Sequence, residues 1–117
     1  MKVLLADDDP DIRDLTAHRF GRRGWTVVTA TTGEEALAEL DAQQFDVVVL
    51  DQNMPPGSGL EVAAARRQAG DRVPIVLWTG WAGLVGGAEA ERLEVHVLNK
   101  SDVSQLTDLV AELAGQA

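Results

Sequence analysis

Two short apolar runs that each end on acidic residues constrain the fold of this chain more than any other feature. The run Val3–Ala6 is followed by Asp7–Asp9, and the run Val47–Leu50 is followed by Asp51. Continuous apolar runs rich in β-branched residues are typical of strands buried on both faces of a parallel sheet. Acids directly after such strands lie at the carboxyl edge of the sheet, where open α/β folds bind their ligands. The runs therefore predict a parallel sheet with carboxylates gathered at one edge.

These carboxylates predict a metal site. If the two runs form neighbouring strands, Asp7, Asp8 and Asp51 share one small volume. Carboxylates at such distances raise each other's pKa unless a cation neutralises them. Their oxygens are hard ligands, which favour Mg²⁺ or a similar ion.

The remaining apolar runs alternate with helical patterns at even spacing, which indicates a βα-repeated fold. The first helix is expected to be capped by Asp9, with Pro10 in its first turn. Thr32 and Glu35 form a capping-box pair for the second helix, and Ser101 can cap the last one. The predicted strands are residues 2–6, 25–30, 45–50, 74–79 and 94–98.

Two segments between these strands have distinctive composition. A loop rich in Pro and Gly precedes a third helix at about residues 60–69. The fourth helix is predicted to be short, because Gly83, Gly86 and Gly87 fall in or before it and each costs about 1 kcal/mol in a helix interior. Residues 1–117 are thus expected to form one (βα)₅ domain.

Composition excludes several function classes. The net charge of −9 argues against nucleic acid and against an anionic membrane surface as partners, because both require basic patches. The chain has no cysteine, so disulfides and thiolate ligands are absent. No apolar stretch reaches membrane-spanning length and no signal-peptide pattern is present, so a cytoplasmic location is expected.

The lysines are rare and one is well placed for chemistry. Of ten basic residues, Lys2 and Lys100 are the lysines. Lys100 follows the fifth predicted strand and Thr79 ends the fourth, so both face the same sheet edge as the acids. Together they supply a metal site, a carboxylate nucleophile at Asp51, a hydroxyl and a point cation. Those are the parts needed to place a phosphoryl group on an aspartate.

Other polar and aromatic residues are interpreted structurally. Neither His18 nor His96 has a spaced metal-ligand partner, and Trp25 is expected to pack in the core. Four arginines of the first helix region are expected to form a solvated face, with docking of a partner as the alternative: Arg13, Arg19, Arg22 and Arg23.

Taken in order and at these intervals, the motifs resemble the receiver domain of bacterial two-component response regulators, over the full length of the chain. The matching segments are residues 3–10, 51–60, 74–80 and 98–100. The resemblance implies a flavodoxin-like, doubly wound parallel sheet of order 2-1-3-4-5. It further implies that Asp51 is the phosphoacceptor. Mg²⁺ would be bound by Asp8, Asp51 and the backbone carbonyl of Asn53, with Asp7 acting through a water.

The resemblance also implies roles around the phosphoryl group. Thr79 and Lys100 would contact it. Asn53 lies two residues beyond Asp51 and Trp81 lies two residues beyond Thr79, and both would tune the lifetime of the phosphorylated state. The large indole of Trp81 would hinder the water that hydrolyses the acyl phosphate. An outward-facing Trp81, packed on the fourth helix or a partner, is the alternative.

Two positions depart from the family pattern. Val97 stands three residues before Lys100, where members commonly have an aromatic switch residue, and Ser101 follows the lysine in place of proline. The phosphorylation chemistry is expected to survive both changes, whereas the usual route to the output surface loses its aromatic part.

The predicted function is a phosphoacceptor module, not an enzyme beyond its own phosphorylation and dephosphorylation. Its donor would be a sensor histidine kinase or a histidine phosphotransfer protein, and its output partner is open. One alternative is a phosphorylation-independent interaction domain on the same fold, suggested by Val97. Another is a haloacid-dehalogenase-like phosphohydrolase using Asp7–Asp9, which would leave Asp51 without a role. A flavodoxin is disfavoured, because no phosphate-binding loop rich in Ser, Thr and Gly follows the first strand.

Overall fold

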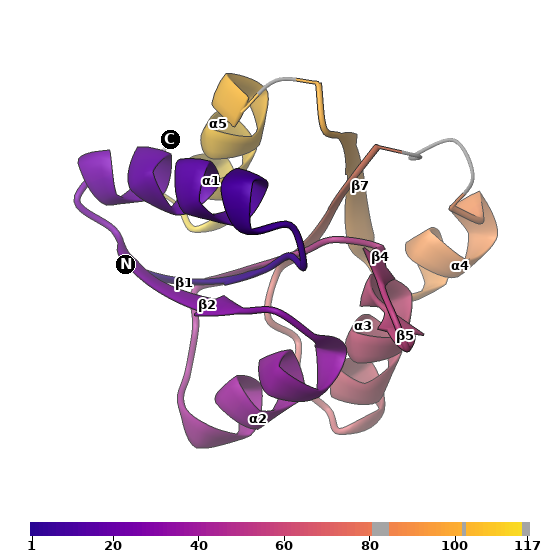
Figure 1. Cartoon of the computed structure of the whole chain (residues 1–117). Coiled ribbons are helices and arrows are strands. Elements are labelled where there is room, and N and C mark those ends of the chain that lie inside the picture. Colours follow the sequence, from indigo (N-terminus) through magenta and orange to yellow (C-terminus); the bar gives the residue numbers. More distant parts are fainter. Residues whose placement is uncertain (81–84, 102, 116–117) are drawn as a thin grey trace.

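A computed structural model describes residues 1–80, 85–101 and 103–115 and shows a parallel sheet with helices on both faces (Figure 1). The elements, in chain order, are β1 (Lys2–Ala6), α1 (Pro10–Arg22), β2 (Thr26–Ala30), α2 (Gly33–Ala42), β3 (Val47–Leu50), β4 (Asn53–Met54), β5 (Gly57–Ser58), α3 (Gly59–Gln68), β6 (Ile75–Thr79), α4 (Gly87–Arg92), β7 (Val95–Asn99) and α5 (Val103–Leu113). None of the helices in the described ranges combines the length and apolarity needed to cross a bilayer.

The main sheet has the predicted order. Its strands lie as β2-β1-β3-β6-β7, and every neighbouring pair is parallel. With the small β4-β5 hairpin set aside, this is the doubly wound order 2-1-3-4-5 of the flavodoxin-like fold. In the register of β1 with β3, Ala6 lies opposite Leu50, so the acids that follow the two strands begin side by side.

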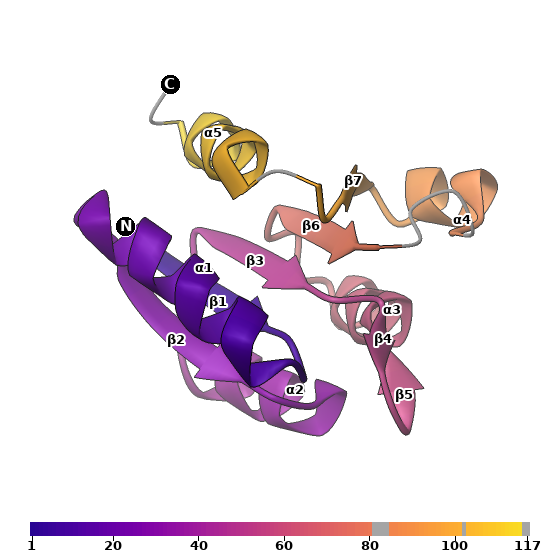
Figure 2. The ribbon, with the colours of Figure 1, turned by 45° about the horizontal axis from the view of Figure 1, so that its top comes forward.

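The sheet separates the core into two layers. Figure 2 shows α1 and α5 on one face and α2, α3 and α4 on the other. Alternate residues of each strand enter one layer or the other, so Val47 and Val49 pack toward α1 and α5 while Val48 and Leu50 pack toward the opposite layer. All four residues of β3 are fully buried. The prediction from continuous apolar runs is therefore confirmed, because a strand covered on both faces has no position for a polar side chain.

The helix starts follow the predicted capping residues in part. The Asp9 carboxylate accepts hydrogen bonds from the backbone of Asp11 at 3.0 Å and Ile12 at 3.3 Å, with Pro10 as the first helical residue. Thr32 accepts from the Glu35 backbone at 3.1 Å. The reciprocal half of the predicted capping box is different, since the Glu35 carboxylate accepts at 2.6 Å from the hydroxyl of Thr31.

The structure tests the prediction for the fourth helix but not the predicted cap of the fifth. Helix α4 spans six residues and begins after Gly86, which has no side chain to cap it, so the predicted short helix is confirmed. The predicted Ser101 cap of α5 adjoins residue 102, which lies outside the described ranges, and it stays a prediction.

The loop rich in Pro and Gly contains structure that the sequence did not reveal. Asn53 pairs with Ser58 and Met54 with Gly57, which forms the two-stranded β4-β5 hairpin around a cis Pro55–Pro56 peptide. Met54 is fully buried and anchors this hairpin to the core. Helix α3 begins at residue 59, in agreement with the predicted helix at about residues 60–69, and the Ser58 hydroxyl accepts from the Glu61 backbone at 3.2 Å.

Gly59 lies in close contact with the backbone at the strand end, Asp51. A Cβ at this position would come within 2.6 Å of the Asp51 carbonyl oxygen and 2.7 Å of Leu77 Cδ2. Gly59→Ala is therefore expected to destabilise the fold by roughly 1–3 kcal/mol, because one contact is rigid backbone. Denaturant unfolding measures this change.

Gly87→Ala is the matched control, because its added Cβ would meet nothing within 4 Å. That variant should be as stable as the wild type or slightly more stable. Equal midpoints for Gly59→Ala and wild type would show that the approach at residue 59 relaxes without cost.

Candidate functional site

The carboxylates of Asp7, Asp8 and Asp51 meet at the carboxyl ends of the adjacent strands β1 and β3. Each offers one ligand oxygen, and these oxygens lie within 4.8 Å of one another. Asp7 and Asp51 are buried, with 1% and 7% of their surface exposed, whereas Asp8 is exposed to solvent. The cluster thus has two fixed carboxylates beneath one accessible carboxylate. Such a set of hard oxygen donors can hold a divalent cation.

Lys100 reaches the same cluster from β7. Its Nζ lies 2.6 Å from Asp7 Oδ2 and 3.2 Å from Asp51 Oδ2. Its backbone nitrogen donates to the Thr79 carbonyl at 3.0 Å, so the ends of β6 and β7 are joined directly beside the acids. Thr79 is buried, with 1% exposed. The structure therefore brings together the acids, the hydroxyl residue and the lysine that the sequence placed at one sheet edge.

Backbone amides orient the two buried carboxylates. The Asp9 amide donates to Asp7 Oδ1 at 3.0 Å, and the Asn53 amide donates to Asp51 Oδ1 at 3.3 Å. In both acids Oδ2 faces Lys100, so each carboxylate is held through both oxygens. The Asn53 side chain is exposed at the start of β4, two residues beyond Asp51.

Arg13 is a site neighbour that the sequence interpretation missed. The prediction of a solvated helix face is wrong for Arg13. Its Nη1 donates to the Asp7 carbonyl at 3.1 Å, and the side chain is half-buried. Arg13 lies in the first turns of α1, which begins just after β1, so its side chain can reach the Asp7 carbonyl. The residue pattern carried no signal for this contact.

The surroundings raise the pKa of Asp51. Burial contributes most, because it disfavours the ionised form, and the charge of Asp7 acts in the same direction. The Lys100 ammonium and the Asn53 amide lower the pKa of Asp51 without offsetting those effects. Without a metal ion, Asp51 is thus an acid that is costly to ionise.

This raised pKa predicts a pH dependence of the metal-free protein. Just above the ordinary Asp value of 3.8, the folded state keeps a proton on Asp51 that the unfolded chain has lost. The free energy of unfolding that the protonated Asp51 contributes therefore decreases as pH rises from 3.8 toward the folded-state pKa of Asp51. In EDTA, Asp51→Asn should melt higher than wild type at neutral pH, and the difference should shrink on acidification. Thermal melts across pH measure it, and a difference that is constant with pH would contradict the assignment to Asp51.

Comparison with known proteins identifies the family. Residues 3–111 match the family model described as the response regulator receiver domain. The chain belongs to this family. The assignment confirms the predicted class of protein, a phosphoacceptor signalling module. This class differs from enzymes that act on a separate substrate.

Curated relatives carry the same type of domain within longer proteins. The chain is 37% identical over 78 residues to the alkaline phosphatase synthesis transcriptional regulatory protein PhoP of Bacillus subtilis, covering 67% of this chain and 32% of PhoP. It is 30% identical over 112 residues to the response regulator protein PilR of Pseudomonas aeruginosa, covering 94% of this chain and 25% of PilR. The receiver domain thus spans a third or less of these two relatives.

Solved structures agree with the fold. The receiver domain of the Francisella response regulator 1452 superposes with a TM-score of 0.90 at 26% identity, covering 98% of this chain and 97% of that one. TrrA of Thermotoga maritima, determined in complex with Mg(2+)-BeF, superposes with a TM-score of 0.86 at 31% identity, covering 96% and 97%. A chain from the complex of histidine kinase ThkA with TrrA gives 0.85 at 32% identity, covering 96% and 97%.

The remaining predicted positions of the receiver domain lie as follows. His18 and His96 are exposed, and Trp25 is buried against Phe20 with ring centroids 5.4 Å apart, so Trp25 packs as predicted. Val97 is half-buried against the layer of α2, α3 and α4. Trp81 lies outside the described residues, so neither its expected position over the site nor the outward alternative is tested.

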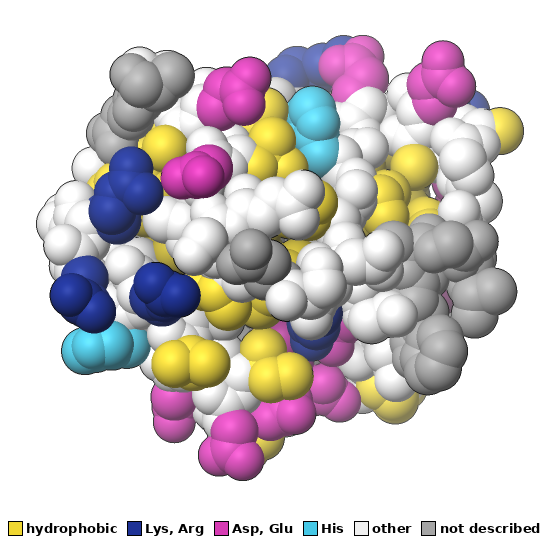
Figure 3. Space-filling model, turned by 90° about the horizontal axis from the view of Figure 1, so that it is seen from above, with side chains coloured by type: hydrophobic (Ala, Val, Ile, Leu, Met, Phe, Trp, Pro, Cys, Tyr) yellow, Lys and Arg dark blue, Asp and Glu magenta, His cyan; other side chains and the backbone are white. Residues whose placement is uncertain are grey.

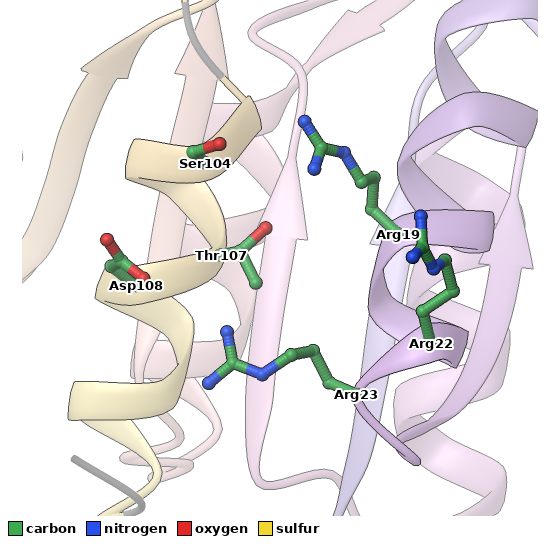
Figure 4. A pocket seen from close by; sticks show the side chains of 6 residues that line it. All are labelled: Arg19, Arg22, Arg23, Ser104, Thr107 and Asp108. Carbon is green, nitrogen blue, oxygen red and sulfur yellow. The ribbon is translucent and has the colours of Figure 1, made fainter.

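The other three arginines line a groove between α1 and α5, near the C-terminal end of α1 and away from the site residues at its start. Dark-blue side chains gather at one side of the face formed by α1 and α5 (Figure 3). In a close view, the guanidinium groups of Arg19 and Arg23 point toward α5 across a groove of about 300 Å³ (Figure 4). Its lining residues are Arg19, Arg22, Arg23, Ser104, Thr107 and Asp108. Arg19 and Arg22 belong to the last turn of α1, where the helix dipole favours positive charge, so the solvated-face interpretation accounts for them.

Proposed function

We propose that this receiver domain accepts a phosphoryl group on Asp51 from a sensor histidine kinase or a histidine phosphotransfer protein, with Mg²⁺ as its cofactor. The observation that carries the proposal is the position of the Asp51 carboxylate, buried beside Asp7 and Asp8 and 3.2 Å from the Lys100 ammonium. The ThkA–TrrA complex supports a kinase as the donor, because one of its chains shares this fold. The same proposal includes that residues 1–117 act as one domain and that this domain is cytoplasmic.

The transfer forms one bond and breaks another. An Asp51 carboxylate oxygen attacks the phosphorus of the donor, the phosphorus–nitrogen bond to the donor histidine breaks, and the nitrogen keeps the electron pair. An acyl phosphate on Asp51 results. Lys100 would neutralise charge on the phosphoryl oxygens, and the hydroxyl of Thr79, at the end of β6, would contact the same oxygens.

The donor set fits a divalent cation. Three carboxylates offer oxygens within 4.8 Å of one another, and the Lys100 ammonium contacts two of them, Asp7 and Asp51. Hard oxygens at this spacing suit Mg²⁺. Asp8 and Asp51 would bind the ion with the Asn53 carbonyl, and Asp7 would act through a water. When bound, Mg²⁺ supplies positive charge between the carboxylates and the phosphoryl oxygens. The structure of TrrA with Mg(2+)-BeF supports this assignment.

Incubation with acetyl phosphate and Mg²⁺ tests the proposed function without knowledge of the natural donor. Intact mass should show one added phosphoryl group that is stable in acid and lost in base, as expected for an acyl phosphate. Omission of Mg²⁺ or addition of EDTA should prevent the change. An unchanged mass under saturating acetyl phosphate would favour the phosphorylation-independent interaction domain, for which Val97 in place of the aromatic switch residue is the supporting observation.

Lys100→Arg should slow phosphorylation by roughly tenfold to a hundredfold. The lysine side chain is 13% exposed and its ammonium sits between two carboxylates, where a wider planar guanidinium does not fit in the same place. The initial rate of mass increase in acetyl phosphate measures the effect. Lys2→Arg is the matched control, because Lys2 begins β1 and the acidic site follows the other end of that strand. This variant should react as wild type. Equal rates for Lys100→Arg and wild type would make the lysine structural.

Trp81 remains a predicted tuning residue, together with Asn53. If its indole overhangs phospho-Asp51, Trp81→Ala should shorten the lifetime of the acyl phosphate while leaving Mg²⁺ affinity unchanged. Decay of the phosphorylated mass in the two proteins compares the lifetimes, and equal half-lives would favour an outward-facing docking role.

A further inference from the structure

Trp78 contacts the lysine of the candidate site, and no sequence motif predicts this contact. It precedes Thr79 in β6 and is 2% exposed. Its indole Nε1–H donates to the Asn99 carbonyl at 3.1 Å, so it holds the backbone immediately before Lys100. The Lys100 Nζ also lies 5.6 Å from the centroid of the Trp78 ring. One side chain therefore contacts both the main chain that carries Lys100 and the ammonium itself.

These contacts restrict a side chain that is otherwise flexible. A lysine has a flexible four-carbon stem, which loses rotamer freedom wherever its charge is fixed. Asp7 and Asp51 hold the Lys100 ammonium through hydrogen-bonding distances of 2.6 and 3.2 Å, and the Trp78 ring adds a third contact. An aromatic ring attracts a cation more strongly where water is excluded, and the Lys100 side chain is 13% exposed.

We propose that Trp78 is a positioning residue for Lys100, which it holds where the phosphoryl oxygens of phospho-Asp51 will lie. The inference rests on the proposed function and deepens it. When the Asp51 carboxylate becomes an acyl phosphate, the ion pair with Lys100 is replaced by contacts to phosphoryl oxygens. The Trp78 contacts do not involve Asp51, so they keep the ammonium in place through that exchange.

Trp78 packs on the face of the sheet that α1 and α5 cover. Trp78 belongs to the buried cluster that includes Leu106 and Val110 of α5, on the face covered by α1 and α5. Val97 packs on the other face of the sheet, with α2, α3 and α4. Within the described residues, the aromatic ring against the lysine thus lies on the opposite side of the sheet from the position where the family's aromatic switch residue is missing.

A purely structural role for Trp78 must be distinguished from positioning, and Trp25 provides the comparison. Trp25 is buried in the same cluster, with 7% exposed. It precedes β2, at the edge of the sheet farthest from β7 and Lys100. A leucine at either position removes an indole from the same core layer, but the change at Trp78 alone removes contacts to Lys100.

The experiment is a double-mutant cycle read on the initial rate of phosphorylation by acetyl phosphate at saturating Mg²⁺. Trp78→Leu should slow the reaction roughly tenfold, and Trp78→Phe should recover part of the loss because it keeps the ring. In a Lys100→Met background, Trp78→Leu should have no further effect, because the group that it positions is gone. Trp25→Leu should change the rate less than twofold in either background. Mg²⁺ affinity should be unchanged by all Trp variants.

Several outcomes would overturn the positioning role. Equal slowing by Trp78→Leu and Trp25→Leu would do so, as would the same slowing by Trp78→Leu in the Lys100→Met background as in wild type. If Trp78→Leu does not fold, Trp78→Phe carries the cycle. If Lys100→Met reacts too slowly, calorimetric binding of beryllofluoride with Mg²⁺ replaces the rate. Failure of the wild type to accept a phosphoryl group would refute the proposed function and the inference with it, whereas failure of the inference alone leaves wild-type phosphorylation intact.

Discussion

Asp51→Asn should take up no phosphoryl group from acetyl phosphate under conditions that label the wild type completely. The amide is nearly isosteric with the carboxylate, so the fold and the Asn53 amide contact are expected to persist. It lacks the anionic oxygen that attacks phosphorus, and loss of the nucleophile should reduce the rate roughly a thousandfold or more. Intact mass after labelling measures the change.

Asp46→Asn is the matched control for this variant. Asp46 immediately precedes β3, at the opposite end of the strand from Asp51, and its carboxylate accepts from the Lys2 backbone at 2.7 Å. It should label as wild type, because its charge is far from the site. Full labelling of Asp51→Asn would show that another group, with Asp8 the nearest accessible carboxylate, accepts the phosphoryl group.

The sheet and the gathering of the acids could be predicted because both depend on patterns that are local in sequence. A continuous apolar run such as Val47–Leu50 is typical of a strand buried on both faces of a parallel sheet, and in such a strand Asp51 lies at the carboxyl edge. The helix starts at Asp9 and Thr32 were visible for the same reason, since a cap and the amides that it binds are two or three residues apart. The lysine was found because Lys is rare in this chain.

The contacts that sequence reasoning missed are long-range or depend on one side-chain direction. Trp78 lies in an apolar strand run, and its link to Asn99 and Lys100 exists because β6 and β7 are paired. Arg13 was assigned to the solvated face because helical periodicity alone does not show the return of its guanidinium to the Asp7 carbonyl. The β4-β5 hairpin depends on burial of Met54, which a Pro- and Gly-rich composition does not reveal.

Millimolar Mg²⁺ should raise the melting temperature of the wild type, and Asp8→Asn should abolish that response. A ligand that binds the folded state alone stabilises it by about 2.7 kcal/mol at one hundred times its Kd. For a chain of this length that gain corresponds to roughly 10 °C. Asp8 is the exposed member of the cluster, so its loss removes a ligand without opening the core. Melts at constant ionic strength, with Mg²⁺ or with EDTA, measure the response.

Asp9→Asn is the control that separates metal binding from a general loss of negative charge. Asp9 lies in the same turn, and its carboxylate caps α1 through the Asp11 and Ile12 amides, a role that Asn fills equally well. It stands outside the carboxylate cluster, so Asp9→Asn should respond to Mg²⁺ as wild type does. In EDTA, Asp8→Asn should melt at or above the wild-type temperature, because one carboxylate fewer repels Asp7 and Asp51. Wild-type melts that are identical with and without Mg²⁺, or an equal loss of response in both variants, would contradict a metal site built on Asp8.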